Sequence, residues 1–211
     1  MIKKGIILLL VTIMSATVCF AQEHRDNWRR PYADIGFNST TMSSANIPDL
    51  MSNYGISFSV GRTFYLHSKP ILGGVRLGID ATWFDLSYTD YQIMNMTYSN
   101  ENRLMQYEQV EIAAQIGPSI TIRPFGRFNI HGYIKYAPTI SNLIANNKMM
   151  SCYSPHIVRG VSVSFGKIGF GVESRAFECR YKEIGAIDHP DNIENISYEG
   201  WRAFLTLVFF L

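Results

Sequence analysis

The feature that most constrains this chain is a regular alternation of apolar and polar residues along several long segments. Successive side chains of a β-strand point to opposite faces, so a period of two predicts strands with one apolar and one polar face. No convincing amphipathic helix pattern competes with it. The clearest segment sets Val110, Ile112, Ala114, Ile116, Ile120 and Ile122 against Gln109, Glu111, Gln115, Ser119 and Thr121. Two others set Val75, Leu77, Ile79, Ala81 and Trp83 against Arg76, Gly78, Asp80 and Thr82, and Ile168, Phe170 and Val172 against Gly169, Gly171, Glu173 and Arg175.

The lengths of the links between these segments predict how the strands are connected. The pattern predicts eight strands, at about 31–40, 53–66, 71–86, 104–122, 128–141, 156–166, 167–181 and 198–211. Three links are short turns with Pro or Gly, at 67–70, 123–127 and 166–167, and they alternate with four longer polar links at 41–52, 87–103, 142–155 and 182–197. Short turns at one end and long loops at the other are typical of an outer-membrane barrel. We therefore predict an all-β fold, an eight-stranded antiparallel up-and-down transmembrane β-barrel with long extracellular loops and short periplasmic turns.

A soluble secreted sandwich or a lipocalin-like barrel also alternates, but it buries its apolar row and exposes its polar row. Two features favour the membrane barrel. The polar faces combine Gly, Glu and Arg, which suits a narrow polar lumen. The last segment, 201–211, is almost uninterruptedly apolar, and a soluble protein would leave it as an adhesive edge. Its outward row would consist of Ala203, Leu205, Leu207, Phe209 and Leu211.

The first residues have the form of an export signal. Lys3 and Lys4 precede an apolar stretch, and small residues at Cys19 and Ala21 come before Gln22. The apolar run of about fourteen residues is short for a membrane anchor helix. We predict a cleaved signal peptide at 1–21, a short lead at 22–30 and the barrel at 31–211. The predicted location is the cell outer membrane.

The charges predict a plugged lumen. Without Lys3 and Lys4 the chain has 17 basic and 17 acidic residues, and a nucleic-acid-binding protein needs a clustered basic excess. The inward polar faces carry equal numbers of acids and bases, and buried charges need partners. Some of these residues would instead be hydrated if they lie near the rims. The predicted lumen network consists of Asp34, Arg76, Asp80, Glu111, Lys135, Glu173, Arg175 and Arg202.

Taken together, the export signal, the eight-strand alternation and the aromatic-rich last strand resemble small outer-membrane barrels of the OmpX and OmpA-transmembrane type. The segments 78–86, 117–122 and 132–138 resemble porin-family barrels of Bacteroides-like bacteria. The chain departs from this pattern in ending on Leu211, where such barrels usually end in Phe or Tyr. The resemblance implies recognition of the last strand by the barrel-assembly machinery.

Cys152 and Cys179 remain once the predicted signal has removed Cys19. The turn near Gly166 predicts antiparallel partners whose numbers sum to about 333, and these two cysteines sum to 331. They would then lie nearly opposite each other in an oxidising compartment, within bridging distance. We predict a disulfide bond, with two free thiols as the alternative if the register slips by one residue.

The sequence offers weak candidates for catalysis. Ser154 lies close to His156, and Asp188 adjoins His189, but no motif of a lipid A deacylase or palmitoyltransferase surrounds them. Isolated polar residues of this kind are common in loops. The five histidines show no metal-ligand spacing, so neither a cofactor nor a metal is predicted.

We predict a non-enzymatic barrel with a side-chain-filled lumen that serves envelope structure, surface display or partner docking through its long loops. An eight-stranded barrel is filled by its own side chains, and diffusion pores need about sixteen strands or more. The alternatives are an outer-membrane lipid-modifying enzyme and a small solute pore. The expected partners are outer-membrane lipid and an unknown extracellular or envelope partner, without nucleic acid.

Overall fold

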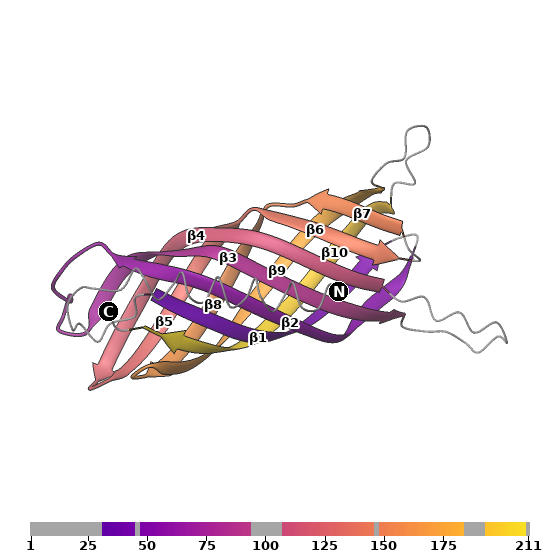
Figure 1. Ribbon diagram of the computed structural model, residues 1–211. Coiled ribbons are helices and arrows are strands. Elements are labelled where there is room, and N and C mark those ends of the chain that lie inside the picture. The colour runs from indigo at the N-terminus through magenta and orange to yellow at the C-terminus, as the bar shows by residue number, and fades with distance from the viewer. Residues whose placement is uncertain (1–30, 45–46, 94–106, 146–147, 184–192, 210–211) are drawn as a thin grey trace.

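The computed structural model describes residues 31–44, 47–93, 107–145, 148–183 and 193–209 (Figure 1). The predicted signal peptide at 1–21 and the lead at 22–30 lie outside these residues. Among the described residues, no helix is long and apolar enough to cross a membrane. The strands are β1 (Pro31–Ser44), β2 (Ile47–Tyr65), β3 (Val75–Ile93), β4 (Tyr107–Phe125), β5 (Phe128–Ala137), β6 (Thr139–Ala145), β7 (Lys148–Tyr153), β8 (His156–Phe165), β9 (Ile168–Glu183) and β10 (Ile193–Val208).

These ten segments form eight barrel strands, because two of the strands are each interrupted once. Pro138 separates β5 from β6, and both segments pair with β4. Ser154 and Pro155 separate β7 from β8, and both segments pair with β9. Proline has no N–H for the ladder, so breaks at these two positions follow from the sequence.

The sheet closes on itself as an antiparallel barrel. Each strand pairs with the next along the chain, and β10 returns to pair with β1, with Tyr32 opposite Val208 and Ser43 opposite Ser197. In the hairpin of β8 and β9, Phe165 pairs with Ile168 and Ile157 with Ala176, so partner numbers sum to 333 as the sequence predicts. The predicted eight-stranded barrel is confirmed.

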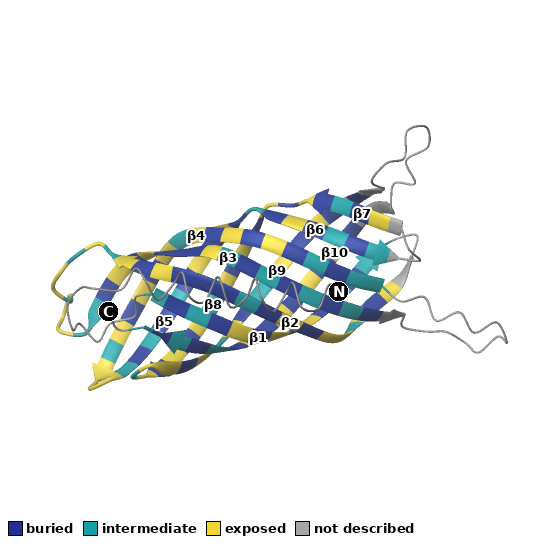
Figure 2. Ribbon diagram, viewed as in Figure 1, coloured by how far each residue is buried: buried dark blue, intermediate teal, exposed yellow. Residues whose placement is uncertain are grey.

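The two faces of the wall differ as the alternation predicts, and Figure 2 shows buried and exposed residues alternating along the strands. In β4 the outward residues Ile112 and Ile116 are 45% and 54% exposed, whereas the inward Gln109 and Glu111 are 1% and 3% exposed. An outward apolar surface of this kind suits contact with lipid tails rather than water. It extends around the barrel through Ile35, Phe37, Ile56, Trp83, Ile134, Val163, Phe170 and Val172.

All four predicted long links overlap strands: β3 continues to Ile93 and β10 starts at Ile193, and the other two links are wrong over most of their length. The link predicted at 41–52 is strand on both sides, since β1 continues to Ser44 and β2 starts at Ile47. The link predicted at 142–155 likewise contains the end of β6 and all of β7. Conversely, the turn predicted at 67–70 is longer: the strand predicted from residue 71 starts only at Val75.

At the end of the barrel opposite the short turns, the pattern of the faces inverts. There the inward residues are apolar: Met42, Phe177, Ile196 and Tyr198 are all buried. Their neighbours, such as Glu178 and Glu199, point outward and are exposed. We call this part, the end of the barrel around these residues, the loop-end section. Its apolar interior and the polar residues on its exterior explain why the sequence there predicts polar loops.

Candidate functional site: the barrel interior

A cluster of four charged residues occupies the middle of the lumen. Asp85 lies on β3, Glu173 and Arg175 on β9, and Arg202 on β10. Arg202 Nη1 lies 2.9 Å from Asp85 Oδ1 and 3.1 Å from Glu173 Oε1. Arg175 Nη2 lies 2.7 Å from Glu173 Oε1 and also forms an ion pair with Asp85. Two acids and two bases thus share their charges, and we refer to them as the central cluster.

The central cluster spans the lumen. In the closed order of eight strands, β3 and β9 are four places apart, which makes them opposite walls of the barrel. The ion pair between Asp85 and Arg175 therefore crosses the lumen. All four side chains are at most 5% exposed. An eight-stranded barrel has an interior just wide enough to be filled in this way.

Neutral side chains from three other strands complete the hydrogen bonding of the central cluster. Arg202 Nε donates to Asn38 Oδ1 at 3.0 Å from β1, and Tyr133 OH donates to Glu173 Oε2 at 2.9 Å from β5. Gln115 of β4 donates to Asp85. Buried charges are tolerated when hydrogen bonds satisfy them in addition to the opposite charge.

Asp85 is missing from the predicted network because of a β-bulge. The alternation in 71–86 puts odd-numbered residues outside, and Asp85 with them. The pairing with β4 shifts between Thr82 and Asp85, and the pairing with β2 shifts between Val60 and Gly61. An extra residue changes which face the following side chains occupy. Trp83 stays outside at 63% exposed, Asp85 turns inward at 2%, and Ala81, predicted outward, is 3% exposed.

A second charged group surrounds Asp80 nearer the short turns. Lys135 Nζ lies 3.4 Å from Asp80 Oδ1 and donates to Thr82 Oγ1 at 2.9 Å. Tyr32 OH donates to Asp80 Oδ1 at 2.5 Å, and His131 Nε2 lies 3.0 Å from Asp80 Oδ2. These partners come from β1 and β5, on either side of β3. The predicted lumen network consists of acidic residues, lysine and arginine alone, so neither His131 nor Tyr32 belongs to it.

The structure places all eight predicted lumen residues in the interior, and none is more than 9% exposed. It brings Glu173, Arg175 and Arg202 together in the central cluster, and Asp80 and Lys135 in the second group. The other three also form hydrogen bonds inside the barrel. Asp34 accepts from Thr206 and, at 3.5 Å, from Ser59; Glu111 accepts from Ser87 at 3.0 Å and Gln109 at 3.1 Å; Arg76 donates to Ser68 O at 2.7 Å.

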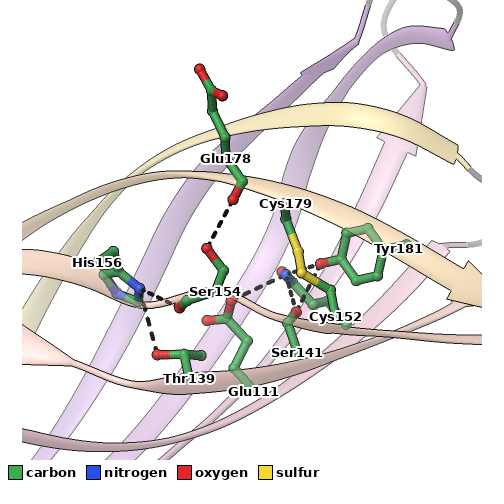
Figure 3. The surroundings of a disulfide bond; sticks show 10 residues. Glu111, Thr139, Ser141, Cys152, Ser154, His156, Glu178, Cys179 and Tyr181 are labelled. Carbon is green, nitrogen blue, oxygen red and sulfur yellow. Dashed lines mark hydrogen bonds between the residues drawn. A yellow bond between two sulfur atoms is a disulfide. The ribbon is translucent and has the colours of Figure 1, made fainter.

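The loop-end section holds the two cysteines. Cys152 of β7 and Cys179 of β9 are joined by a disulfide bond with their Cα atoms 6.3 Å apart (Figure 3). Both are buried in the apolar cluster of this section. Beside them the rings of Phe177 and Tyr198 stack with centroids 4.3 Å apart. The disulfide bond joins β7 to β9, and the stacked rings join β9 to β10.

A short chain of polar side chains lies beside the disulfide, since Ser141 pairs with Cys152. Gln109 Nε2 donates to Tyr181 OH at 2.9 Å and to Ser141 Oγ at 2.8 Å, and Tyr91 OH donates to Gln109 Oε1 at 2.5 Å. These contacts join β3, β4, β6 and β9 across the interior. Tyr91 falls in the link predicted at 87–103 and Tyr181 at the end of the strand predicted at 167–181, so the sequence does not predict that either contacts Gln109.

Ser154 and His156 do not form a hydroxyl–imidazole pair. Ser154 Oγ donates to the backbone oxygen of Glu178 at 2.8 Å, and His156 Nδ1 lies 3.3 Å from the backbone oxygen of Ser154 (Figure 3). A nucleophile and its base need a direct hydrogen bond between side chains. The candidates Asp188 and His189 lie outside the described residues. Within the described segments, no group of three or more His, Cys, Asp or Glu residues is arranged to hold a metal ion.

Comparison with known proteins identifies the fold. No family model and no curated protein matches the chain. Among solved structures, the neisserial surface protein NspA aligns with a TM-score of 0.51 at 11% identity, over 89% of this chain and 100% of that chain. Ail, the attachment invasion locus protein of Yersinia pestis, gives 0.43 at 9% identity over 86% and 99% of the two chains. The outer-membrane protease OmpT of Escherichia coli gives 0.46 at 13% identity over 85% and 97%.

The chain has the fold of a small outer-membrane β-barrel. The similarity to NspA concerns the fold alone, and the surface of this chain adds the second argument. Large apolar side chains, among them Phe37 at 72% and Phe170 at 65%, are exposed around the wall, while the charges of the central cluster and of the group around Asp80 are inside. In water, exposing apolar side chains and burying charges are both unfavourable. A barrel surrounded by lipid needs an apolar outer surface and keeps its charges inside. Fold and surface together place the barrel in an outer membrane, as predicted from the sequence.

Proposed function

We propose that this protein is a non-enzymatic outer-membrane barrel that passes no solute through its lumen and acts through its loop-end section. The observation that carries the proposal is the ion pair between Asp85 and Arg175, which joins opposite walls of the barrel. Lys135 with Asp80 on one side and Gln109 with Tyr181 on the other add two further levels of contacts through the interior. A solute would have to break all three.

The length of the strands supports a role for the loop-end section. β2, β3 and β4 each have 19 residues, whereas about 9–11 suffice to cross the bilayer. The surplus lies largely at the loop end, where the disulfide and the apolar cluster hold the strands together. This makes a rigid platform outside the apolar wall, suited to envelope structure, surface display or docking of an extracellular or envelope partner.

The proposal includes the finer features predicted from the sequence. These are a cleaved signal peptide, kinship with OmpX-like and porin-family barrels of Bacteroides-like bacteria, and recognition of the last strand by the barrel-assembly machinery. Outer-membrane lipid is the expected surrounding, and nucleic acid is not an expected partner. The location of NspA, named as a surface protein, is in keeping with this proposal.

Two measurements on the purified mature barrel test the proposal. In planar bilayers the wild-type protein is expected to show no steady conductance of the size of a porin, and such a conductance would favour the solute pore instead. Incubated with lipid A and with phospholipid, it is expected to release or transfer no acyl chains by mass spectrometry. Acyl transfer that disappears in Ser154→Ala or His156→Ala would overturn the non-enzymatic assignment.

A further inference from the structure

Arg159 is a charged side chain on the outer face of the apolar wall. Arg159 of β8 is exposed, and the residues before and after it on the same face, Ile157 and Val161, are apolar and each 45% exposed. Its partner on β5, Ile134, is 52% exposed. Ile157 is on the row of Ala176 and Glu199, so Arg159, one row further from the loop end, is in the last row of the apolar wall on that side. In the described part of the chain, its guanidinium makes no hydrogen bond or ion pair.

A cation on a lipid-facing surface calls for an anion. Arginine on the lipid face of a barrel is destabilising, most of all at the middle of the bilayer, unless it reaches the interface or a partner. Arg159 is in one row with Ser174 of β9 and Trp201 of β10. The outward carboxylate of Glu178 lies four residues from Ser174 along β9, and that of Glu199 lies two residues from Trp201 along β10. The protein therefore leaves the partner of this arginine to be supplied from outside.

The register gives Arg159 polar neighbours on one level. Arg159 pairs with Ser174, and Ser174 pairs with Trp201, which is 65% exposed on the outer face. A guanidinium, a hydroxyl and an indole N–H thus stand side by side on β8, β9 and β10. Arginine binds phosphate through two parallel hydrogen bonds, and tryptophan is enriched at the level of lipid headgroups.

An apolar hollow begins directly on the turn side of this row. It has a volume of about 610 Å³, within the range of small-molecule sites of roughly 300–1,000 Å³. The first level of its lining is Val161, Val172 and Ala203, and the next is Val163, Phe170 and Leu205. Ala203 is the small residue that deepens the hollow between its larger neighbours. The hollow thus continues away from Arg159 as an acyl chain continues away from its headgroup.

We propose that this face binds one phosphate-headed lipid, with the phosphate at Arg159 and Ser174 and an acyl chain in the hollow. The site goes beyond the proposed function, since it lies on the outer wall and uses neither the lumen nor the loop-end section. A second copy of the chain fits less well. A two-fold axis along the membrane normal would bring two Arg159 side chains to the same depth, and like charges repel.

Quenching of Trp201 fluorescence by brominated lipids tests the site. The chain has three tryptophans, so replacing Trp28 and Trp83 by Phe leaves Trp201 as the reporter. The barrel is placed in phosphatidylcholine vesicles containing the same small fraction of either dibrominated phosphatidic acid or dibrominated phosphatidylcholine. We expect about fivefold preferential association of phosphatidic acid, the effect of one arginine near anionic lipid. Arg159→Ala is expected to abolish the preference.

Arg62→Ala is the matched control, because Arg62 is also an outward arginine and β2 lies four places from β8 in the ring. It is expected to keep the preference. Ala203→Phe, which fills the hollow, is expected to lower it while Arg159 is intact. Equal quenching by the two lipids, or a preference that survives in Arg159→Ala, would overturn the proposal. Weak quenching by both lipids, together with a dimer that Ala203→Phe disrupts, would also overturn the proposal. A second copy of the chain would then cover this face.

Discussion

The middle of the barrel and its loop-end section fill the same interior with opposite chemistry. In the middle, Asp85, Arg175 and Arg202 are inside and Ile35 and Phe170 are outside. At the loop end, Phe177 and Tyr198 are inside and Glu178 and Glu199 are outside. The strands are continuous through both: β9 contributes Arg175 to one interior and Phe177 to the other, two residues later.

This difference shows that the surroundings decide which face is apolar. Against lipid the outer face must be apolar, and the charges that remain are buried and paired with one another. Against water the outer face is polar, and the apolar side chains form an ordinary core. The inversion along β9 and β10 therefore marks where the wall leaves the bilayer.

The largest effect is expected from Asp85→Ala in the middle section. Removing this carboxylate leaves Arg175 and Arg202 with Glu173 as the remaining acid of the central cluster. Breaking a buried ion pair in this way costs about 3–5 kcal/mol of unfolding free energy. Denaturant unfolding in lipid vesicles measures it. Asp90→Ala on the same strand, which removes an exposed contact to Asn53, is the control and is expected to cost less than about 0.5 kcal/mol. Equal costs would show that the central cluster is hydrated rather than closed.

A lysine on the outer face is expected to distinguish the sections next. Ile116→Lys places a charge on the apolar wall, where about 2–4 kcal/mol of unfolding free energy is lost near the bilayer centre. Ser197→Lys places the same charge outside the loop-end section, and its effect is expected within about 0.5 kcal/mol. The same unfolding measurement applies to both. A barrel of the soluble type would tolerate both lysines, which would contradict the membrane account.

The disulfide contributes less, because the hairpin already constrains its two ends. The double variant Cys152→Ala/Cys179→Ala is expected to lose about 2 kcal/mol of unfolding free energy, with the central cluster unaffected. Counting thiols in the denatured, non-reduced wild-type protein accompanies it. Two free thiols per mature chain would show that the bond does not form in the cell.

The smallest effect is expected from Tyr133→Phe. This change removes one hydrogen bond from a neutral hydroxyl to the Glu173 carboxylate, whose charge stays paired with Arg175 and Arg202. A loss of about 1.5 kcal/mol of unfolding free energy is expected, because the acceptor is charged. A loss as large as that of Asp85→Ala would show that the hydroxyl, and not the ion pairing, holds the central cluster together.

Alternation predicts the fold well along most of the wall that faces lipid. The faces of β4 and the pairing of β8 with β9 agree with the sequence residue by residue. Two physical causes explain the failures. A bulge after Thr82 adds a residue to the count and turns Asp85 inward, and alternation alone does not show where a bulge lies. At the loop end the polar residues of the strands face water, so Ser43 and Asn142 resemble loop residues.

The sequence predicts which charged residues face the interior of the barrel, but not which of them contact one another. The sequence marks Glu173, Arg175 and Arg202 as inward because they alternate with apolar residues. It does not show that Asp85 joins them from the opposite wall, since that depends on closure of the sheet. Tyr181 and Gln109 likewise meet only once the barrel is closed.

The central claim is that the bilayer ends where the faces invert, between Trp201 and Glu199 on β10. Single spin labels at the outward positions 197, 199, 203, 205 and 207, in lipid vesicles, test it through their collisions with oxygen and with a water-soluble nickel complex. The account predicts that labels at 203, 205 and 207 collide mainly with oxygen and labels at 197 and 199 mainly with nickel. Nickel collisions at all five positions, or oxygen collisions at all five, would contradict it.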